Sequence, residues 1–149
     1  IYDSQQNNVL GLTCPTTPAI LSYMNTILGL TCISEELKDI DKKKYSFQTM
    51  TRKRFNDLCN TEDRNEALRQ LSERILHNIV VTQYILNHCA KSDIGHYRLS
   101  SNLCPLVTDE TLEIDFETLP DIEAIKQEFR HIGILAKTLG ISMGSHPDQ

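Results

Sequence analysis

The sequence predicts an α/β fold built on a parallel sheet, because three strand patterns alternate with two amphipathic helical patterns. The strand patterns cover residues 26–33, 96–100 and 141–145, and the helical patterns cover residues 60–90 and 120–139. A β-α-β-α-β order requires parallel strands joined by right-handed crossovers. A parallel sheet is normally covered on both faces, which two helices cannot do well. We therefore expect these elements to be part of a larger sheet.

The composition is that of one globular unit, with 149 residues of which 40% are hydrophobic and 23% charged. The formal net charge of −5 is opposite to the excess that marks a general nucleic-acid binder. The sequence shows neither a membrane span nor a leader pattern, so we expect an intracellular protein without a membrane partner or an obligate protein partner. Five cysteines without a CxxC pair indicate reduced thiols.

The first strand is expected after a loosely structured lead-in over residues 1–25, where Pro15 and Pro18 oppose regular structure. The folded domain is then residues 26–149. Its first apolar, partly β-branched run breaks at Ser34, as a short buried strand does.

A long helix is expected next. Asn60 or Thr61 can cap its amino end, and apolar residues recur at helical spacing as far as Ala90. Asn78 lies among these apolar residues, and we expect its half-buried amide to satisfy backbone groups of a neighbouring loop.

The second strand alternates, with Tyr97 and Leu99 on one face and Arg98 and Ser100 on the other. A guanidinium in a buried strand needs a carboxylate or a phosphate, so Arg98 forms either a salt bridge or a substrate contact. The second helix is expected to open at Pro120 and to end at Gly140, before the third strand.

Two parallel architectures compete, an open doubly wound sheet and a closed barrel. An open sheet would bind a nucleotide after its first strand, but no glycine-rich phosphate loop follows here. A barrel places its chemistry at the carboxyl ends of the strands, where this sequence has polar residues: Ser34, Ser101, Asn102, Asp109, His146 and Gln149. A barrel typically needs about 250 residues. We therefore predict the amino-terminal βαβαβ portion of a (β/α)8 TIM barrel, incomplete at this length.

Few single residues carry a chemical signal. His146 at a strand exit is either a metal ligand or an ordinary loop histidine, and Asp109 is either a metal ligand or a turn former. Cys104 is most simply a packed thiol.

Six basic residues without an intervening acid form either a solvated surface or a phosphate-facing patch: Lys42, Lys43, Lys44, Arg52, Lys53 and Arg54.

Several segments together carry a resemblance to a known family. They are Tyr97–Ser101, Leu103–Leu106, Gln127–Gly133 and Ser145–Gln149, supported by the first strand, by Asn78 and by the stretch from Thr51 to Leu58. With these residues the sequence resembles the UV-damage endonuclease family over roughly residues 26–149.

The resemblance implies a barrel that recognises double-stranded DNA with UV photoproducts and hydrolyses the phosphodiester on the 5′ side of the lesion. It also implies divalent metal ions, typically manganese, and a location with the DNA, in the nucleus if the source is eukaryotic. His146 matches a metal ligand and Gln149 matches the residue that probes the duplex. Arg98, Ser100 and Ser101 match the second strand and are candidates for shaping the DNA site, to which the basic cluster at Arg52, Lys53 and Arg54 would add phosphate contacts.

The sequence departs from the family at four residues. Asp109-Glu110 replaces a usual His-Pro pair, so Asp109 is a hypothetical substitute ligand. Leu30 and Ser34 stand where members often carry an aromatic residue and an Asn close to the metals, which weakens the assignment of an active site there. The catalytic residue is therefore unassigned, with Ser34 as a candidate.

These departures keep alternatives open. One is a degenerate, non-catalytic TIM-barrel DNA-binding protein, and the others are an abasic-site endonuclease and a sugar isomerase built on a metal-dependent barrel. Later strands would supply further ligands, so we expect the isolated chain of 149 residues not to incise DNA.

Overall fold

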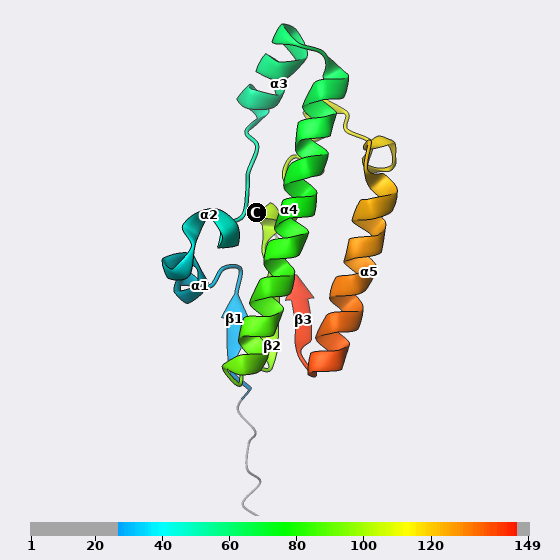
Figure 1. Ribbon diagram of the computed structural model, residues 1–149. Coiled ribbons are helices and arrows are strands. Elements are labelled where there is room, and N and C mark those ends of the chain that lie inside the picture. Colours follow the sequence, from blue (N-terminus) through cyan, green and yellow to red (C-terminus); the bar gives the residue numbers. More distant parts are fainter. Residues whose placement is uncertain (1–26, 146–149) are drawn as a thin grey trace, which may run out of the picture.

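The computed structural model describes residues 27–145, so the predicted lead-in and the predicted roles of His146 and Gln149 lie outside the described residues. Figure 1 shows the arrangement of the elements. In chain order they are β1 (Gly29–Thr31), α1 (Glu35–Ile40), α2 (Lys42–Tyr45), α3 (Arg52–Thr61), α4 (Arg64–Lys91), β2 (His96–Leu99), the 3-10 turns η1 (Ser101–Leu103), η2 (Glu110–Leu112) and η3 (Phe116–Thr118), α5 (Ile122–Leu139) and β3 (Ser142–Ser145).

The three described strands form one parallel sheet in the order β1-β2-β3. The register places Leu30 beside Tyr97 and Tyr97 beside Met143. The helices α4 and α5 cover one face of this sheet, and the strands all point toward the end of the molecule where α3 lies (Figure 1). The predicted α/β class and the parallel βαβαβ order are confirmed, whereas closure into a barrel stays a prediction.

The opposite face of the sheet is open within residues 27–145, which corrects two predictions about burial. The first strand was expected to be buried, but Gly29 and Thr31 in β1 are exposed. Arg98 was expected to be a buried guanidinium, but its side chain is exposed on the open face. Both errors have one cause, because the described part of the sheet has helices on one side only.

The long helix α4 starts later than predicted. Its N-cap is Asp63, whose carboxylate accepts a hydrogen bond of 2.7 Å from the Glu66 backbone N–H. Asn60 and Thr61 instead belong to the last turn of α3, where the Thr61 hydroxyl donates to the Asp57 carbonyl at 2.8 Å. The prediction of a cap at Asn60 or Thr61 was therefore wrong, because a separate short helix occupies those residues.

Three short helices between β1 and α4 were not predicted. Ser34 caps α1 and Thr51 caps α3, each by accepting a backbone N–H with its side-chain oxygen. These helices have six, four and ten residues, which is too short for a clear helical period in the sequence.

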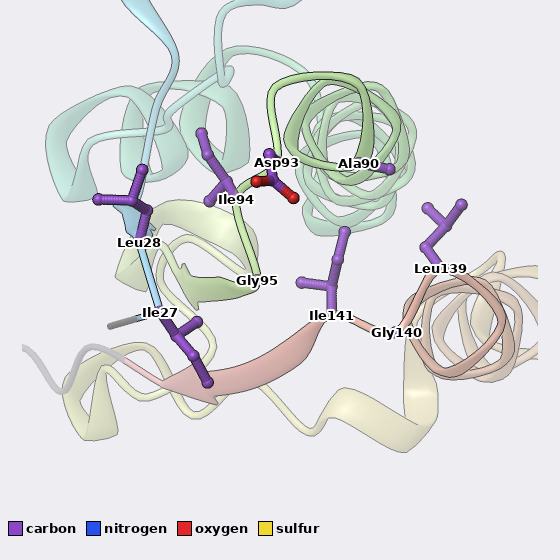
Figure 2. A pocket seen from close by; sticks show the side chains of 9 residues that line it. All are labelled: Ile27, Leu28, Ala90, Asp93, Ile94, Gly95, Leu139, Gly140 and Ile141. Atoms are coloured by element: carbon purple, nitrogen blue, oxygen red, sulfur yellow. The ribbon is translucent and has the colours of Figure 1, made fainter. Parts of the chain in front are cut away.

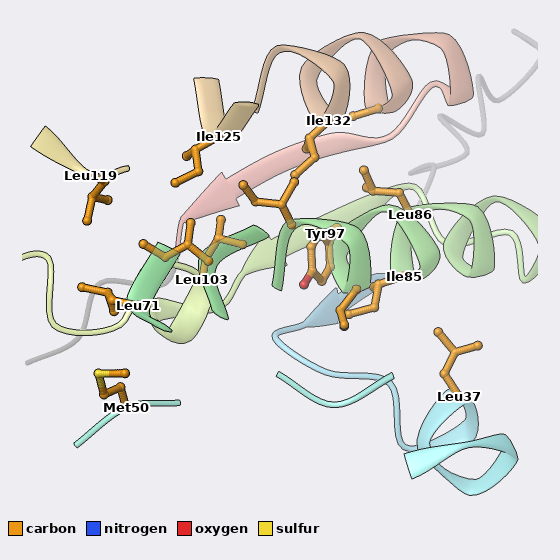
Figure 3. Packing of buried hydrophobic residues seen from close by; sticks show 14 of the residues in the cluster. Leu37, Met50, Leu71, Ile85, Leu86, Tyr97, Leu103, Leu119, Ile125 and Ile132 are labelled. Carbon is orange, nitrogen blue, oxygen red and sulfur yellow. The ribbon is translucent and has the colours of Figure 1, made fainter. Parts of the chain in front are cut away.

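The second long helix follows the prediction closely. Asp121 stands at the N-cap position of α5, and Gly140 ends the helix with a φ of 69°, a left-handed conformation that glycine adopts without strain. The core lies between α4, α5 and the sheet (Figure 3). Its fully buried members include Leu71, Ile75, Ile79, Leu86, Tyr97 and Ile125. No helix within residues 27–145 is long and apolar enough to cross a membrane.

Candidate functional site

A cavity of about 710 Å³ lies at the carboxyl ends of β2 and β3. Four parts of the chain form its walls: the segment before α3, the loop from the end of β2 toward η2, Phe129 of α5, and the last residue of β3. The lining residues are Thr49, Met50, Leu99, Ser100, Ser101, Asn102, Leu103, Cys104, Pro105, Leu106, Thr108, Phe129 and Ser145. Parallel α/β folds place their catalytic and binding residues at these carboxyl ends of the strands.

The predicted site residues Ser100 and Ser101 both line this cavity. Ser100 is buried, and its hydroxyl accepts a hydrogen bond of 3.1 Å from the Asn102 backbone N–H, which starts the turn η1. Ser101 is exposed at the start of η1. The hydroxyl of Ser100 thus shapes the wall of the cavity, and the hydroxyl of Ser101 is accessible for contact.

The remaining wall combines apolar and hydroxyl-bearing side chains with a strained backbone position. Leu106 has a φ of 63°, which side chains other than glycine rarely adopt, and it lines the cavity. Burial raises the pKa of the Cys104 thiol to about 11, so this thiol is protonated at neutral pH. The interpretation of Cys104 as a packed, unreactive thiol agrees with this environment.

The side chain of Asn78 contacts two of the segments that line the cavity. Its side chain is fully buried and bonds the backbone of Gln48, Asn102 and Leu103. The prediction that this amide satisfies a neighbouring loop is confirmed. The amide bonds two segments, at Gln48 and at Asn102. Its side chain is fully buried, whereas the sequence predicted a half-buried one.

The turn that follows β1 does not line the cavity, but a hydrogen bond from β2 fixes it. Cys32 has a φ of 63°, and the buried Tyr97 donates its hydroxyl to the Cys32 carbonyl at 2.8 Å. Burial raises the pKa of Tyr97, which keeps the hydroxyl a donor. Ser34 follows this turn and is buried, with its hydroxyl accepting from the Leu37 backbone N–H at 3.3 Å. The structure therefore shows Ser34 as a helix cap, and a catalytic role for it stays a prediction.

Arg98 lies away from the cavity, on the open face of the sheet. There it neighbours His96 around Gly144, where an added Cβ would lie 3.5 Å from the His96 ring and 4.0 Å from the Arg98 Cγ. The Ser142 hydroxyl donates to the Gly95 carbonyl at 3.1 Å, so it accepts from His96 Nδ1 at 2.8 Å. A DNA contact by Arg98 stays a prediction.

Asp109 stands at the rim of the cavity, next to the lining residue Thr108. One carboxylate oxygen, Oδ1, accepts from the Thr111 backbone N–H at 3.0 Å and from the Thr111 hydroxyl at 2.6 Å. The other, Oδ2, pairs with Arg52 Nε at 2.8 Å. The Thr111 hydroxyl and then Arg52 lower the pKa of Asp109. The structure shows the turn-forming role, and metal ligation by Asp109 stays a prediction.

The basic cluster is divided between two elements. Lys42, Lys43 and Lys44 form α2, and Lys44 lies over the ring of Tyr84 at 4.8 Å. The other three residues begin α3, which lies at the far end of α4 from α1 and α2 (Figure 1). Of those three, Arg52 is paired with Asp109, and Lys53 and Arg54 are exposed.

A second, smaller cavity of about 270 Å³ lies at the amino ends of the strands (Figure 2). It is lined by apolar residues such as Ile27, Leu28 and Leu139, together with Asp93. It contains none of the predicted site residues, and the amino ends of barrel strands serve stability rather than chemistry.

No group of three His, Cys, Asp or Glu side chains within residues 27–145 could hold a metal ion. Asp109 is also committed to Thr111 and Arg52 through both carboxylate oxygens. The described residues alone therefore do not make a metal centre.

Several residues that line the cavity were not among the predicted site residues, including Thr49, Met50, Thr108 and Ser145. The first three belong to irregular segments without a periodic signal. Ser145 could have been found, because it is the last residue of the predicted third strand and directly precedes His146.

Known proteins resemble the chain over most of its length. The family model described as "UV-endonuclease UvdE" matches residues 26–149. A protein named UV DNA damage endonuclease from Nostoc sp. is 33% identical over 135 residues, which are 91% of this chain and 38% of that relative. Proteins of the same name from Bacillus pumilus and Bacillus cereus are 28% and 29% identical over 102 residues, which are 68% of this chain and 29% of each relative. The chain thus spans between about a quarter and two fifths of the length of these relatives.

Proposed function

The chain belongs to the UvdE family of UV endonucleases, and from this premise we propose that it supplies the first βα units of an enzyme that cuts DNA on the 5′ side of UV photoproducts. The family match over residues 26–149 carries this proposal. The cavity at the carboxyl ends of β2 and β3 supports it, because barrel enzymes bind their substrates at that edge.

The barrel is completed, in this proposal, by further strands of a full-length protein. The relatives are much longer than the matched region, and the described sheet has an open face and parallel strands. A closed barrel would cover that face with side chains of the added strands. His96 and Arg98 would then point into the barrel interior.

The metal ions, in this proposal, are manganese and are held in part by His146. Ser145, which precedes His146 in the sequence, lines the cavity at the end of β3. Bound divalent ions would supply an activated water and neutralise the phosphate.

The DNA contacts, in this proposal, come from polar side chains near the same end of the sheet. Gln149, three residues after His146, would probe the duplex at the lesion. Ser101, Thr49 and Thr108 would offer hydroxyls to the DNA strand.

Incision of irradiated and unirradiated duplex DNA by the full-length protein tests this function. We expect manganese-dependent cutting of the irradiated duplex only. Equal cutting of both duplexes, or preference for a duplex with an abasic site, would contradict the proposal. The variant His146→Ala should bind manganese more weakly than the wild type. His131→Ala, which removes an exposed histidine of α5, is the matched control and should leave manganese affinity unchanged.

One observation favours a non-catalytic DNA-binding protein as the second candidate. Asp109 stands where the family usually has a ligand histidine, and both of its carboxylate oxygens are occupied by Thr111 and Arg52. If the full-length protein binds irradiated DNA but does not cut it with any divalent metal, this second function replaces the first.

A further inference from the structure

Two of the segments that line the cavity are attached to a single buried side chain. Thr49 and Met50 come from the irregular segment 46–51, and Ser101 and Asn102 come from η1. These two segments are far apart in the sequence. Asn78, in the middle of α4, is the side chain that contacts both.

The Asn78 amide is used at both of its polar atoms. Its Oδ1 accepts from the Gln48 backbone N–H at 2.7 Å, and its Nδ2 donates to the Gln48 carbonyl at 2.9 Å. The same Nδ2 donates to the Asn102 carbonyl at 2.8 Å and lies 3.4 Å from the Leu103 carbonyl. An amide has two donor hydrogens and an acceptor oxygen, so it can serve both segments at once. A carboxylate lacks the donors and an aliphatic side chain lacks both functions.

Two further contacts lie nearby, and neither joins segment 46–51 to η1. His77 Nε2 lies 3.0 Å from the Ser46 carbonyl, which requires the hydrogen of that ring to be on Nε2. At the rim, the exposed Arg52 pairs with Asp109. Asn78 is the only one of these residues that is fully buried, where a hydrogen bond left unmade is expensive.

We propose that Asn78 is a positioning residue, which sets the separation of segment 46–51 and η1 and thereby the shape of the cavity. The link between this geometry and DNA cleavage rests on the proposed function. Segment 46–51 has no helix or strand of its own, so its backbone is fixed by α4 rather than by a neighbour in a sheet. Thr49 and Ser101 therefore line the cavity from two segments that contact one amide.

Amide hydrogen exchange on the full-length protein tests the positioning without any assay of activity. In the wild type, the Gln48 amide should exchange about as slowly as amides in the middle of α4, although Gln48 is exposed and lies in an irregular segment. Asn78→Asp keeps the acceptor but loses the donors to the Asn102 and Leu103 carbonyls. The turn η1 then loses this attachment, so the Asn102 and Leu103 amides, which bond Ser100, should exchange faster than in the wild type. Ser72→Ala is the control, because it removes a buried hydroxyl of the same helix that has no partner within the described residues. Fast exchange at Gln48 in the wild type would overturn the proposal.

Kinetics distinguish positioning from a general loss of stability. Asn78→Asp and Asn78→Ser should lower kcat by on the order of tenfold to a hundredfold at a temperature where each variant is folded. Ile132→Ala, a buried core variant of α5, should lower the midpoint of thermal unfolding with little change in kcat. Equal kcat values for the Asn78 variants and Ile132→Ala would overturn the positioning role. A wild type that does not cut DNA refutes the proposed function instead, and the exchange result still decides the role of Asn78.

Discussion

At the residue scale, the predicted polar residues are used in two different ways. Ser34 and Asp109 were singled out as candidates for chemistry, and the structure shows both capping short helical turns. Ser100 and Ser101 line the cavity, as their position at the end of the predicted second strand suggested. Capping could have been anticipated from residue type, but the partner of Asp109 could not. Arg52 is far from it in the sequence, and only the packing of α3 against the η2 loop brings the two together.

The first prediction concerns the acid stability that Asp109 provides. Its pKa is lowered in the folded state, chiefly by the Thr111 hydroxyl and then by Arg52. Its contribution is therefore fully present above the pKa of the unfolded chain, about 3.9 for an aspartate, and is lost as the pH falls through the lower folded value. Asp109→Asn should be less stable than the wild type at neutral pH, and the difference should shrink below a pH of about 4. Denaturant unfolding at several pH values measures this.

The variant Thr111→Val is the control for that measurement, because it removes the hydroxyl donor and keeps the side-chain shape. It should weaken the dependence of stability on pH that Asp109 confers. A difference between Asp109→Asn and the wild type that stays constant down to pH 2 would contradict the assignment.

At the element scale, the two long helices and the strands followed from periodicity, while the short helices did not. The alternation of Tyr97 with Arg98 fixed the faces of β2, and Gly140 fixed the end of α5. The burial of β1 and of Arg98 was misjudged, because it depends on what covers the open face and not on the local pattern. The three helices between β1 and α4 depend on caps and on packing against α4, which a short window of sequence does not reveal.

The second prediction compares Gly133, inside α5, with Gly140, the C-cap of the same helix. Gly140 has a left-handed φ of 69°, and an added Cβ at Gly140 or at Gly133 would meet nothing within 4 Å. Gly140→Ala should therefore destabilise the fold by about 1 kcal/mol through backbone strain alone. Gly133→Ala, inside the helix, should stabilise it by about 0.5–1 kcal/mol. Thermal or denaturant unfolding of both variants measures this, and two changes of the same sign would contradict the described end of α5.

The third prediction concerns the basic residues of α3 in DNA binding. Lys53 and Arg54 are exposed, whereas Arg52 is paired with Asp109. If α3 faces the phosphates, Lys53→Ala and Arg54→Ala should each reduce the slope of log K against log salt by about 0.9. Arg52→Ala should reduce it less, because the guanidinium is already neutralised. Binding isotherms of the full-length protein at several salt concentrations measure the slopes. Unchanged slopes for Lys53→Ala and Arg54→Ala would return these residues to the interpretation as a solvated surface.

At the scale of the whole molecule, the sequence indicated a portion of a larger α/β architecture, and the structure shows a parallel sheet with one open face. The carboxyl edge of that sheet carries the larger cavity, as the barrel hypothesis requires. The composition of the site was less accessible to sequence reasoning, since Thr49, Met50 and Thr108 enter it from irregular segments. The contact of Asn78 with Gln48, next to Thr49, is long-range in the sequence, and a local pattern does not specify it.

The central claim is that these units belong to an endonuclease that cuts 5′ to UV photoproducts. The most direct test maps the products formed by the full-length protein, with manganese, from an end-labelled duplex that contains one defined photoproduct. We expect a single break on the 5′ side of the lesion, no break in the undamaged duplex, and no break from the isolated chain of 149 residues. Cutting at positions unrelated to the lesion, or cutting by the isolated chain, would contradict it.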